Sequence, residues 1–489
     1  MASPVQRMTR RAPHDFAAWY GLANCLQGDD VVVPDRSSLS GWRFRSSYHH
    51  ALQAYQQAFR LLPAIHQSLR SDGYETVRLL LMTSSFRRLG HALAPDTTQF
   101  LAHAMWQHDS LVFIPDVRSA MSGLAGVRVR PTRDQLDAAL RHGRQLFHEI
   151  ASAWLAAAPQ NAGALEAMAV SLEMLGDPSC LDTLRRARSV ERDPNEQLRL
   201  AANEVWVRLK FSIPNDVAGV RAARAMADSI LATHPSRSGG HARLLASLAV
   251  VTGRAGLAAQ IAREGAAEWD TPVQIAQSAP ALLAFAALGG PRDSLIALER
   301  QVATGIDNAL SVSTQHQARM QWLARPAELA FPGVQLSSIS RLAGSGDYIV
   351  DAEAAYLRGD SSAVRRTFTD LRVIRRSMPP ASVMVDGLYP EAALLVSIGE
   401  EAEAIDWLDA TLNVLAGTEP GVLADPPRAG ALVRAMALRA ELADRAGDRE
   451  TASRWAQVVR VLWSDADAFL RPRVAEMASF DARSRGPTH

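Results

Sequence analysis

The sequence predicts an all-α protein, an α-solenoid of antiparallel helical hairpins interrupted by two long irregular loops. In most segments, apolar residues recur three, four or seven positions apart, as they do on one face of a helix. Residues typical of helix starts and helix ends flank these segments. The apolar fraction of 48% is ample for burial, and stacked hairpins bury their apolar faces on one another rather than in one central core.

Residues 132–155 illustrate how single helices are recognised. Thr132 and Gln135 make a capping-box pattern at a helix start. The apolar residues that follow share one helical face: Leu136, Leu140, Phe147, Ile150, Ala151 and Trp154. Asp193–Pro194 and Thr271–Pro272 carry another start signal, a capping residue followed by proline in the first turn. We therefore expect helices to begin near residues 132, 194 and 272.

The clearest hairpin lies between residues 19 and 63, in WYGLANCL and YHHALQAYQQAFRLLP. Small residues at fixed offsets let its two helices approach, and large residues fill the space between them. The matching residues are Trp19, Leu22, Ala23, Leu26, Ala51, Tyr55, Ala58 and Pro63. Between the two halves, over residues 28–45, lies an insertion of about sixteen residues beyond the loop of a simple unit.

On these residues the chain resembles the tetratricopeptide-repeat family, whose unit is a helical hairpin with this pattern. The stretches RAPHDFAAWYGLANCL and GWRFRSSYHHALQAYQQAFRLLP also look like the repeat region that follows the kinase domain in some bacterial Ser/Thr protein kinases. The family resemblance implies a superhelical scaffold that binds peptides or partner proteins without catalysis. Because the family's hairpin is uninterrupted, we do not expect a continuous binding groove near residues 28–45. We expect this first unit to continue a larger ancestral architecture, since no polar capping helix precedes it.

Weaker hairpins follow, each centred on a turn glycine. The glycines are Gly176, Gly253, Gly359, Gly399 and Gly447. Each is expected to end one helix with a positive φ angle, a conformation that glycine adopts without steric cost. An apolar residue five positions later then starts the inner face of the next helix, as Val364 does after Gly359.

These signals divide the chain into helical segments and two loops. The expected segments are an N-terminal repeat with its insertion and following helices (1–94), an irregular loop (95–131), helical repeats (132–324), an irregular linker (325–347), further helical repeats (348–480) and a tail (481–489). Proline and glycine are frequent in both irregular stretches, although VQLSSISRLA in the second is compatible with a short helix. The strand-like runs DVVVPD, SLVFIPD and GVRVRP lie in non-helical stretches. Loops this long are uncommon in compact domains and are often functional.

Composition argues against several classes of protein. The net charge of +1 does not favour nucleic-acid binding through bulk charge. Lys210 is the only lysine and lies outside any glycine-rich loop, so the sequence has no phosphate-binding P-loop. The H-R-D and D-F-G segments of a kinase are also missing. Cys25 and Cys180 form neither a disulfide framework nor a zinc site, and we expect both to be buried.

We predict no catalytic, cofactor-binding or metal-binding residue. His103 and His108 are five positions apart, which does not place two ligands on one helical turn. The N-terminus lacks the apolar segment of a secretory signal, and the longest apolar runs are too short to cross a bilayer. A cytoplasmic protein without membrane contact is therefore expected.

The insertion carries the first set of candidate partner-binding residues: Asp29, Asp30, Trp42, Arg43 and Arg45. Tryptophan and arginine are the residue types found most often at binding hot spots. Alternatively, Trp42 and Phe44 pin the insertion onto the first two helices, and an arginine pairs with one of the insertion's aspartates, which include Asp35, to close it. Changing Trp42 to alanine distinguishes these roles, because a contact residue affects binding whereas a pin affects stability.

A basic stripe is the second candidate. Arg365, Arg372 and Arg376 are seven and four positions apart and would share one helix face. Such a stripe is suited to an acidic peptide or a phosphate-bearing partner. The alternative is the solvated face of an exposed helix.

The sequence thus favours a non-catalytic scaffold for contacts with a protein or peptide partner. The alternative is a regulatory module that senses a small ligand and works with a bacterial Ser/Thr kinase or a transcription regulator. An enzyme with a helical fold is a third possibility, and it would require titratable residues clustered in one pocket. The sequence does not identify the partner or the oligomeric state.

Overall fold

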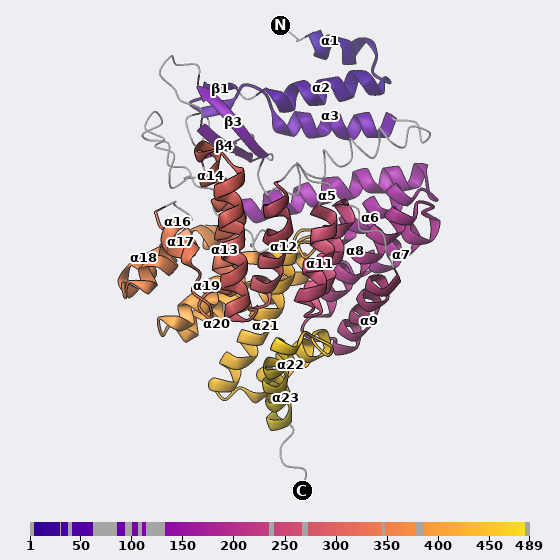
Figure 1. The fold of residues 1–489 in the computed structure, drawn as a ribbon. Helices are drawn as coiled ribbons and strands as arrows, with labels where there is room; N and C mark the ends of the chain where they lie inside the picture. The colour runs from indigo at the N-terminus through magenta and orange to yellow at the C-terminus, as the bar shows by residue number, and fades with distance from the viewer. Residues whose placement is uncertain are drawn as a thin grey trace. The chain divides into compact units, whose positions relative to one another are not determined.

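A computed structural model describes residues 4–29, 31–37, 42–61, 86–92, 100–105, 110–113, 133–233, 239–266, 272–344, 348–377 and 385–484. The chain divides into two compact units. Unit 1 comprises Met1–Glu191 with Val373–Ser382, and unit 2 comprises Arg192–Arg372 with Val383–His489. Figure 1 shows helices along most of the described chain.

The helices of unit 1 pack one after another along the chain. Their bounds are α1 (Pro4–Arg11), α2 (Phe16–Gly28), α3 (Tyr48–Leu61), α5 (Arg133–Ala157), α6 (Ala162–Met174) and α7 (Cys180–Val190). Each helix packs against the next one described, from α1 on α2 through to α6 on α7. The polar helix α1 thus precedes the first hairpin, and the expectation that no such helix precedes it is wrong. The helix predicted to begin near residue 132 is α5.

The predicted first hairpin is confirmed by α2 and α3. Ala23 and Ala58 are fully buried on these two packed helices. The Tyr55 hydroxyl donates a hydrogen bond to Asn24 Oδ1 at 2.6 Å, and Tyr20 meets Tyr55 edge-on with ring centroids 5.7 Å apart. The small and large residues of the repeat pattern therefore have the packing roles expected of them.

Unit 1 also contains short strands. Within the described residues they are β1 (Val31–Pro34), β2 (Trp42–Phe44), β3 (Phe86–Ala92), β4 (Phe100–Met105) and β5 (Ser110–Phe113). They are ordered β1-β2-β5-β4-β3, and β1 also pairs with β3, in parallel, to close a small barrel. All the other pairings are antiparallel; in β1 and β2, Val33 lies opposite Arg43.

The prediction of irregular loops is therefore wrong for parts of 28–45 and 95–131. The strand-like runs DVVVPD and SLVFIPD contain β1 and β5, whereas GVRVRP lies outside the described residues. A strand, β3, also lies in 1–94, where helices were expected to follow the first repeat. Strands depend on partners that are distant in sequence, as β1 and β3 are, so local periodicity does not reveal them.

Unit 2 is built of helices, and α18 continues from it into the segment grouped with unit 1. The bounds are α8 (Pro194–Ser212), α9 (Val217–Thr233), α10 (Gly239–Val251), α11 (Ala255–Ala266), α12 (Val273–Ala287), α13 (Arg292–Ala309), α14 (Val312–Arg319), the π-helical turn η2 (Met320–Ala324), α15 (Arg325–Ala330), α16 (Ser337–Leu342), α17 (Tyr348–Leu357), α18 (Ser361–Ser377), α19 (Val385–Ser397), α20 (Glu401–Leu412), the 3₁₀ turn η4 (Leu415–Gly417), α21 (Pro426–Arg445), α22 (Arg449–Leu462), the 3₁₀ turn η5 (Ala468–Leu470) and α23 (Arg471–Ser484). Successive helices pair, as in α8–α9, α10–α11, α12–α13, α19–α20 and α21–α22. Apart from the short strands of unit 1, the all-α class is confirmed, with helix starts near residues 194 and 272 as predicted.

All five predicted turn glycines adopt the left-handed conformation, with φ between 76° and 83°. At the α17–α18 turn, the Gly359 amide donates to the Tyr356 carbonyl (2.9 Å) and the Asp360 amide to the Ala355 carbonyl (3.0 Å). This pair of bonds is a Schellman cap, in which glycine satisfies the last helical carbonyls. The carboxylate of Asp360 then accepts from the Ala363 amide at the start of α18 (2.9 Å), so one glycine–aspartate pair ends one helix and begins the next.

Residues 325–347 are more ordered than predicted. They contain α15 and α16, and only 345–347 lie outside the described residues. The carboxylate of Glu299, on α13, accepts hydrogen bonds from the amides of Ser337 (3.1 Å) and Ser338 (2.6 Å) at the start of α16. The short helix expected in VQLSSISRLA is therefore present as α16, and its capping residue lies 38 positions away in sequence.

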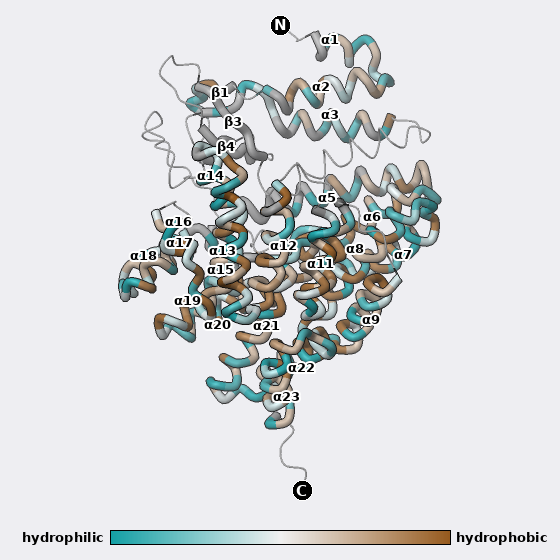
Figure 2. The backbone as a smooth tube through the Cα atoms, viewed as in Figure 1, coloured by the Kyte–Doolittle hydropathy of each residue, from teal (hydrophilic) through white to brown (hydrophobic). Residues whose placement is uncertain are grey.

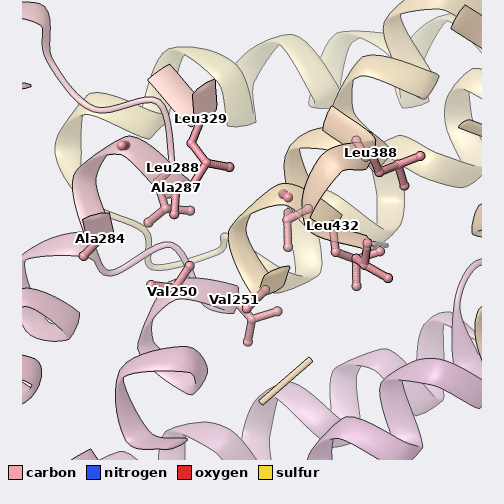
Figure 3. Packing of buried hydrophobic residues seen from close by; sticks show 14 of the residues in the cluster. Val250, Val251, Ala284, Ala287, Leu288, Leu329, Leu388 and Leu432 are labelled. Carbon is pink, nitrogen blue, oxygen red and sulfur yellow. The ribbon is translucent and has the colours of Figure 1, made fainter. Parts of the chain in front are cut away.

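The core of unit 2 centres on α21. Figure 2 shows hydrophobic and hydrophilic residues alternating along most helices, as expected where one face is buried. α21 is different, because 15 of its 20 residues are buried, which means that it is enclosed on most sides. Figure 3 shows its Leu432 in one cluster with Val250, Ala287, Leu329 and Leu388. These come from α10, α12, α15 and α19.

Candidate functional site

The insertion in the first hairpin is held by ion pairs. Arg45 donates from Nε and Nη2 to the two carboxylate oxygens of Asp29 (2.9 and 2.8 Å), and Arg43 Nε lies 3.0 Å from Asp35. The Ser46 hydroxyl donates to the Leu26 carbonyl at 2.7 Å. The backbone hydrogen bonds of β1 and β2 lie between these anchors. The structure thus brings Asp29 and Arg45 together, as the arginine–aspartate alternative required.

Two other candidates in the insertion are only partly placed. The backbone of Trp42 lies in β2 opposite Pro34, and its side chain is outside the description. Asp30 lies outside the described residues. Asp35, an acidic residue of the insertion that was not chosen as a partner-binding residue, pairs with Arg43. It also accepts hydrogen bonds from the Ser37 hydroxyl (2.6 Å) and the Ser37 amide (2.9 Å). These Ser37 bonds, with Arg43 nearby, lower the pKa of Asp35 below its ordinary value.

The basic stripe lies on α18 and meets acidic residues of the next hairpin. Arg365 Nε donates to Glu400 at 2.9 Å, and Arg372 Nε donates to Glu403 at 3.0 Å. The side chain of Arg376, in the same helix, is outside the description. Two of the three stripe arginines therefore bridge α18 to the α19–α20 hairpin, and an acidic partner at this face would compete with the chain's own glutamates.

The remaining sequence candidates supply no chemical centre. Within the described ranges, no group of three or more histidine, cysteine or acidic side chains is placed to hold a metal. Cys180 is buried, but Cys25 is exposed, so the prediction that both are buried is wrong for Cys25. Cys25 lies two positions after the buried Ala23, and a helix turns by about 200° over that distance. None of the described helices is long and apolar enough to cross a membrane.

In unit 2, the face where a repeat scaffold would be expected to bind a peptide is covered by the chain itself. α8, α10 and α12 are the first helices of three successive hairpins, and α21 packs against both α10 and α12. The turn η4, ahead of α21, packs against α8. At Gly430 the two backbones are so close that an added Cβ would lie 2.4 Å from the Ala287 carbonyl oxygen. A peptide cannot lie along this face while α21 occupies it.

Buried cations hold this covering segment in place. Lys210, 1% exposed, donates from α8 to the carbonyls of Thr418 (2.9 Å) and Glu419 (3.2 Å). Arg434, on α21, donates to the carbonyls of Ala286 (3.0 Å) and Leu329. Both of these carbonyls belong to the last turns of helices, where the helix dipole is negative and favours a cation.

Arg434 also stacks on an aromatic ring. Its guanidinium carbon lies 3.7 Å from the centre of the Tyr389 ring, a cation–π geometry. Burial lowers the pKa of the Arg434 guanidinium, and the contact with Tyr389 opposes that change. Helix ends and an aromatic face thus accommodate the buried charge and tie α21 to α12, α15 and α19.

A cavity of about 530 Å³ remains at the N-terminal end of α21, between α10, α11, α12, η2 and α15. Most of its wall is alanine and proline: Ala242, Ala246, Ala258, Ala262, Ala279, Ala284, Pro280, Pro326, Pro426 and Pro427. Leu283 and Trp322 complete the apolar part, and Arg243, Gln321, Arg325 and Asp425 are its polar residues. Its size and composition are those of small-molecule sites.

The local structure at this cavity departs from regular helix in two places. Trp322 belongs to the π-helical turn η2, a feature that often marks functional sites. Pro280 lies inside α12 and cannot donate the hydrogen bond that a helical residue makes four positions back. The proline at position 280 is visible in the sequence, but the sequence does not reveal that Pro280 and Trp322 line one cavity.

A second cleft, of about 650 Å³, lies between α9, α22 and α23, and charged residues form part of its lining. The buried Arg224 donates to the Leu462 carbonyl (2.6 Å) and to the Ser464 hydroxyl (2.9 Å), and Arg460 donates to Asp481 (2.6 Å). Burial lowers the pKa of Arg224, and the nearby Asp465 opposes this. These groups form hydrogen bonds with one another, so we interpret the cleft as a contact between helices that stabilises the fold.

Comparison with known proteins adds no family assignment. No family model and no curated protein matches the chain. Solved structures that share some likeness include yeast Tom70 (13% identity, 98% of this chain and 84% of that chain, TM-score 0.26). Others are the P58(IPK) TPR domain (12% identity, 72% and 94%, TM-score 0.20) and a circular tandem repeat protein with a novel repeat topology (12% identity, 90% and 90%, TM-score 0.19). At these TM-scores the likeness supports no argument, and the helix packing itself defines the fold.

Proposed function

We propose that this protein is a non-catalytic helical-repeat scaffold of the cytoplasm that binds a protein or peptide partner and binds neither nucleic acid nor membrane. The observation that carries the proposal is the geometry of the insertion. Arg43 and Arg45 keep 47% and 61% of their side chains exposed while Asp35 and Asp29 hold them in place. Side chains ordered in advance lose less conformational entropy on binding, and arginine is a frequent hot-spot residue.

The partner surface in this proposal is formed by Asp29, Asp30, Trp42, Arg43 and Arg45. The basic stripe of Arg365, Arg372 and Arg376 is a second contact, available to an acidic segment that displaces Glu400 and Glu403. The covered face of α8, α10 and α12 supports this choice, because it leaves binding to surfaces outside the repeat groove.

The test is photo-crosslinking from the insertion. A benzophenone amino acid at the exposed Arg36 position, between β1 and β2, captures a partner that touches the hairpin. Amine-directed reagents are unsuitable, because the only lysine, Lys210, is 1% exposed. The captured protein is purified, and its affinity is measured by calorimetry for the wild type and for the Arg43→Ala/Arg45→Ala variant. We expect the variant to bind about tenfold more weakly with a Tm near that of the wild type.

The matched control is Arg221→Ala, an exposed arginine on α9 in unit 2, which should bind the partner like the wild type. Equal affinity of the insertion variant and the wild type for the captured protein would exclude this surface.

The second candidate function is a ligand-sensing regulatory module associated with a bacterial Ser/Thr kinase or a transcription regulator. The cavity of about 530 Å³ in unit 2 favours the sensing part, and the resemblance around the first hairpin motivates the kinase association. Co-purification of the chain with a kinase or regulator encoded beside it tests the association. Absence of such a gene, or failure of its product to bind, counts against it.

A further inference from the structure

We infer that the alanine-walled cavity of unit 2 binds a small molecule with an apolar body and one carboxylate group. This inference rests on the ligand-sensing alternative and is independent of the protein-binding surface in unit 1. It follows from the shape of the cavity, from the rigidity of its wall and from the charge at its edge.

The cavity is preformed. Its wall consists mainly of alanine and proline side chains, which have no rotamers to change and so cannot swing inward to fill the space. Protein interiors are otherwise close-packed, and about 530 Å³ is room for roughly 18 water molecules at about 30 Å³ each. An apolar space of this size is best occupied by an apolar ligand body.

The surroundings favour a small molecule over a peptide. Six elements bound the cavity, and α21 closes the face along which a peptide backbone would have to continue. Pro426 and Pro427 begin α21 at the cavity wall and offer no backbone N–H to pair with a peptide. The wall thus provides apolar contact on several sides and few partners for a chain of amides.

The polar edge favours an anionic group. Arg243 donates from Nε (3.0 Å) and Nη2 (2.7 Å) to one oxygen of Asp425. Within the described residues, Arg243 Nη1 has no hydrogen-bond acceptor, and the side chain is 64% exposed. The end-on edge of a guanidinium presents two parallel N–H groups that match a carboxylate.

Of the two arginines that line the cavity, Arg243 is the better placed to meet a ligand carboxylate. The cavity is lined by Arg243, Arg325 and Asp425. Arg325 pairs with Glu328, and Arg428 lies 3.9 Å from Asp425. The side chain of Arg243 is 64% exposed and that of Arg325 is 25% exposed, so Arg243 is the cation that a ligand carboxylate reaches more easily.

The experiment compares three probes of equal length on the full chain: octanoate, octan-1-ol and octylamine. Binding is measured by calorimetry and by the shift in Tm. We expect octanoate to bind most tightly, the alcohol more weakly and the amine least. The Arg243→Gln variant should weaken octanoate binding about tenfold and change octan-1-ol binding less than twofold. Arg221→Gln, in the other cleft, should leave all three affinities unchanged.

The second part of the experiment uses variants that fill the cavity. Ala284→Leu and Ala246→Leu each add apolar volume to the wall, so both should abolish probe binding without lowering Tm, and either variant suffices if the other misfolds. The inference is overturned if octan-1-ol or octylamine binds the wild type as tightly as octanoate does, if the filled variants still bind, or if the wild type binds no probe. Partner capture at the insertion is a separate measurement, so failure here leaves the scaffold proposal untouched.

Discussion

In this chain, individual buried arginines donate hydrogen bonds to the carbonyl groups at the ends of helices. Arg434 and Arg224 reach the last turns of distant helices, Arg434 at Ala286 and Leu329 and Arg224 at Leu462. Carbonyls in a last helical turn lack intrahelical partners, and a guanidinium can satisfy several of them at once. An arginine-rich composition is therefore used partly as internal helix capping.

Arg434→Met tests this role. The variant keeps the apolar volume of the side chain but leaves the carbonyls of Ala286 and Leu329 without their donor. Each unsatisfied buried carbonyl costs about 1–3 kcal/mol, so we expect the free energy of unfolding of unit 2 to fall by about 2–5 kcal/mol. Urea unfolding followed by circular dichroism measures the change. Arg221→Met, on the exposed face of α9, is the control, and equal losses in the two variants would contradict the capping role.

The small size of Ala58 is what allows α3 to pack closely on α2. Ala58 is fully buried in α3, which packs on α2, so Ala58→Trp should overpack the hairpin and cost about 1–3 kcal/mol of stability. The exposed Arg60, on the same helix, supplies the control Arg60→Trp, which should change stability by less than about 0.5 kcal/mol. Thermal melting distinguishes the two variants. An unchanged Tm for Ala58→Trp would contradict the assignment of Ala58 to the small, buried position of the repeat pattern.

At the scale of elements, the recurrent unit is a helix pair joined by glycine and an acidic residue. Gly447 has a φ of 78°, and Asp448 then accepts a hydrogen bond from the Thr451 amide at 3.1 Å to begin α22. The Thr451 bonds lower the pKa of Asp448 below its ordinary value. The same arrangement at Gly359 and Asp360 shows that these joints are local devices, which is why the sequence predicts them.

The cap at Asp448 has a defined pH dependence. Because its folded-state pKa is lowered, its contribution is fully present above the unfolded value of about 3.9 and is lost as pH falls through the folded value. Asp448→Ala should cost about 0.5–2 kcal/mol at pH 7, and the gap from the wild type should close as the solution is acidified below pH ~4. Urea midpoints across this range measure it. Asp370→Ala, an exposed aspartate within α18, should show no comparable gap; a gap for Asp448→Ala that stays constant with pH would refute the cap.

At the scale of the whole molecule, unit 2 departs from a simple chain of repeats. In an open solenoid each repeat contacts only its neighbours, so stability is a sum of local terms. Here α21 packs on α10 and α12, and α22 packs on α9. The C-terminal hairpins are therefore part of the core of the earlier ones rather than an addition to their end.

Truncation distinguishes these two kinds of architecture. Removing residues 413–489 deletes η4, α21, α22 and α23 and uncovers the apolar faces of α10 and α12. We expect residues 192–412 to lose protection from proteolysis, with a loss of helical signal larger than the deleted helices account for. Removing only residues 471–489, which leaves α21 in place, should preserve a cooperative transition with a lower Tm. If residues 192–412 stay protected in the longer truncation, the array is open and its stability local.

Of the two candidate sites, one could be recognised in the sequence and the other could not. The insertion was visible in the sequence because it breaks a hairpin pattern, and its Asp29–Arg45 pair joins residues that are both close to the ends of that break. The cavity was not visible, because its wall combines Ala246, Ala284, Trp322 and Pro426 from segments far apart in the chain. Alanine also gives no sequence signal of a binding site, since its role here is to leave space.

By itself, the sequence determined the helical class, the helix starts at Pro194 and Val273, the first hairpin and the glycine-centred turns. These features depend on residues within a few positions of one another, through helical periodicity, capping and the conformational freedom of glycine. Only the tertiary structure decided the strands of unit 1, the placement of α21 over α10 and α12, and the cavity beside Pro426. Each of these depends on contacts between residues that are distant in sequence, and no local pattern encodes which distant surfaces meet.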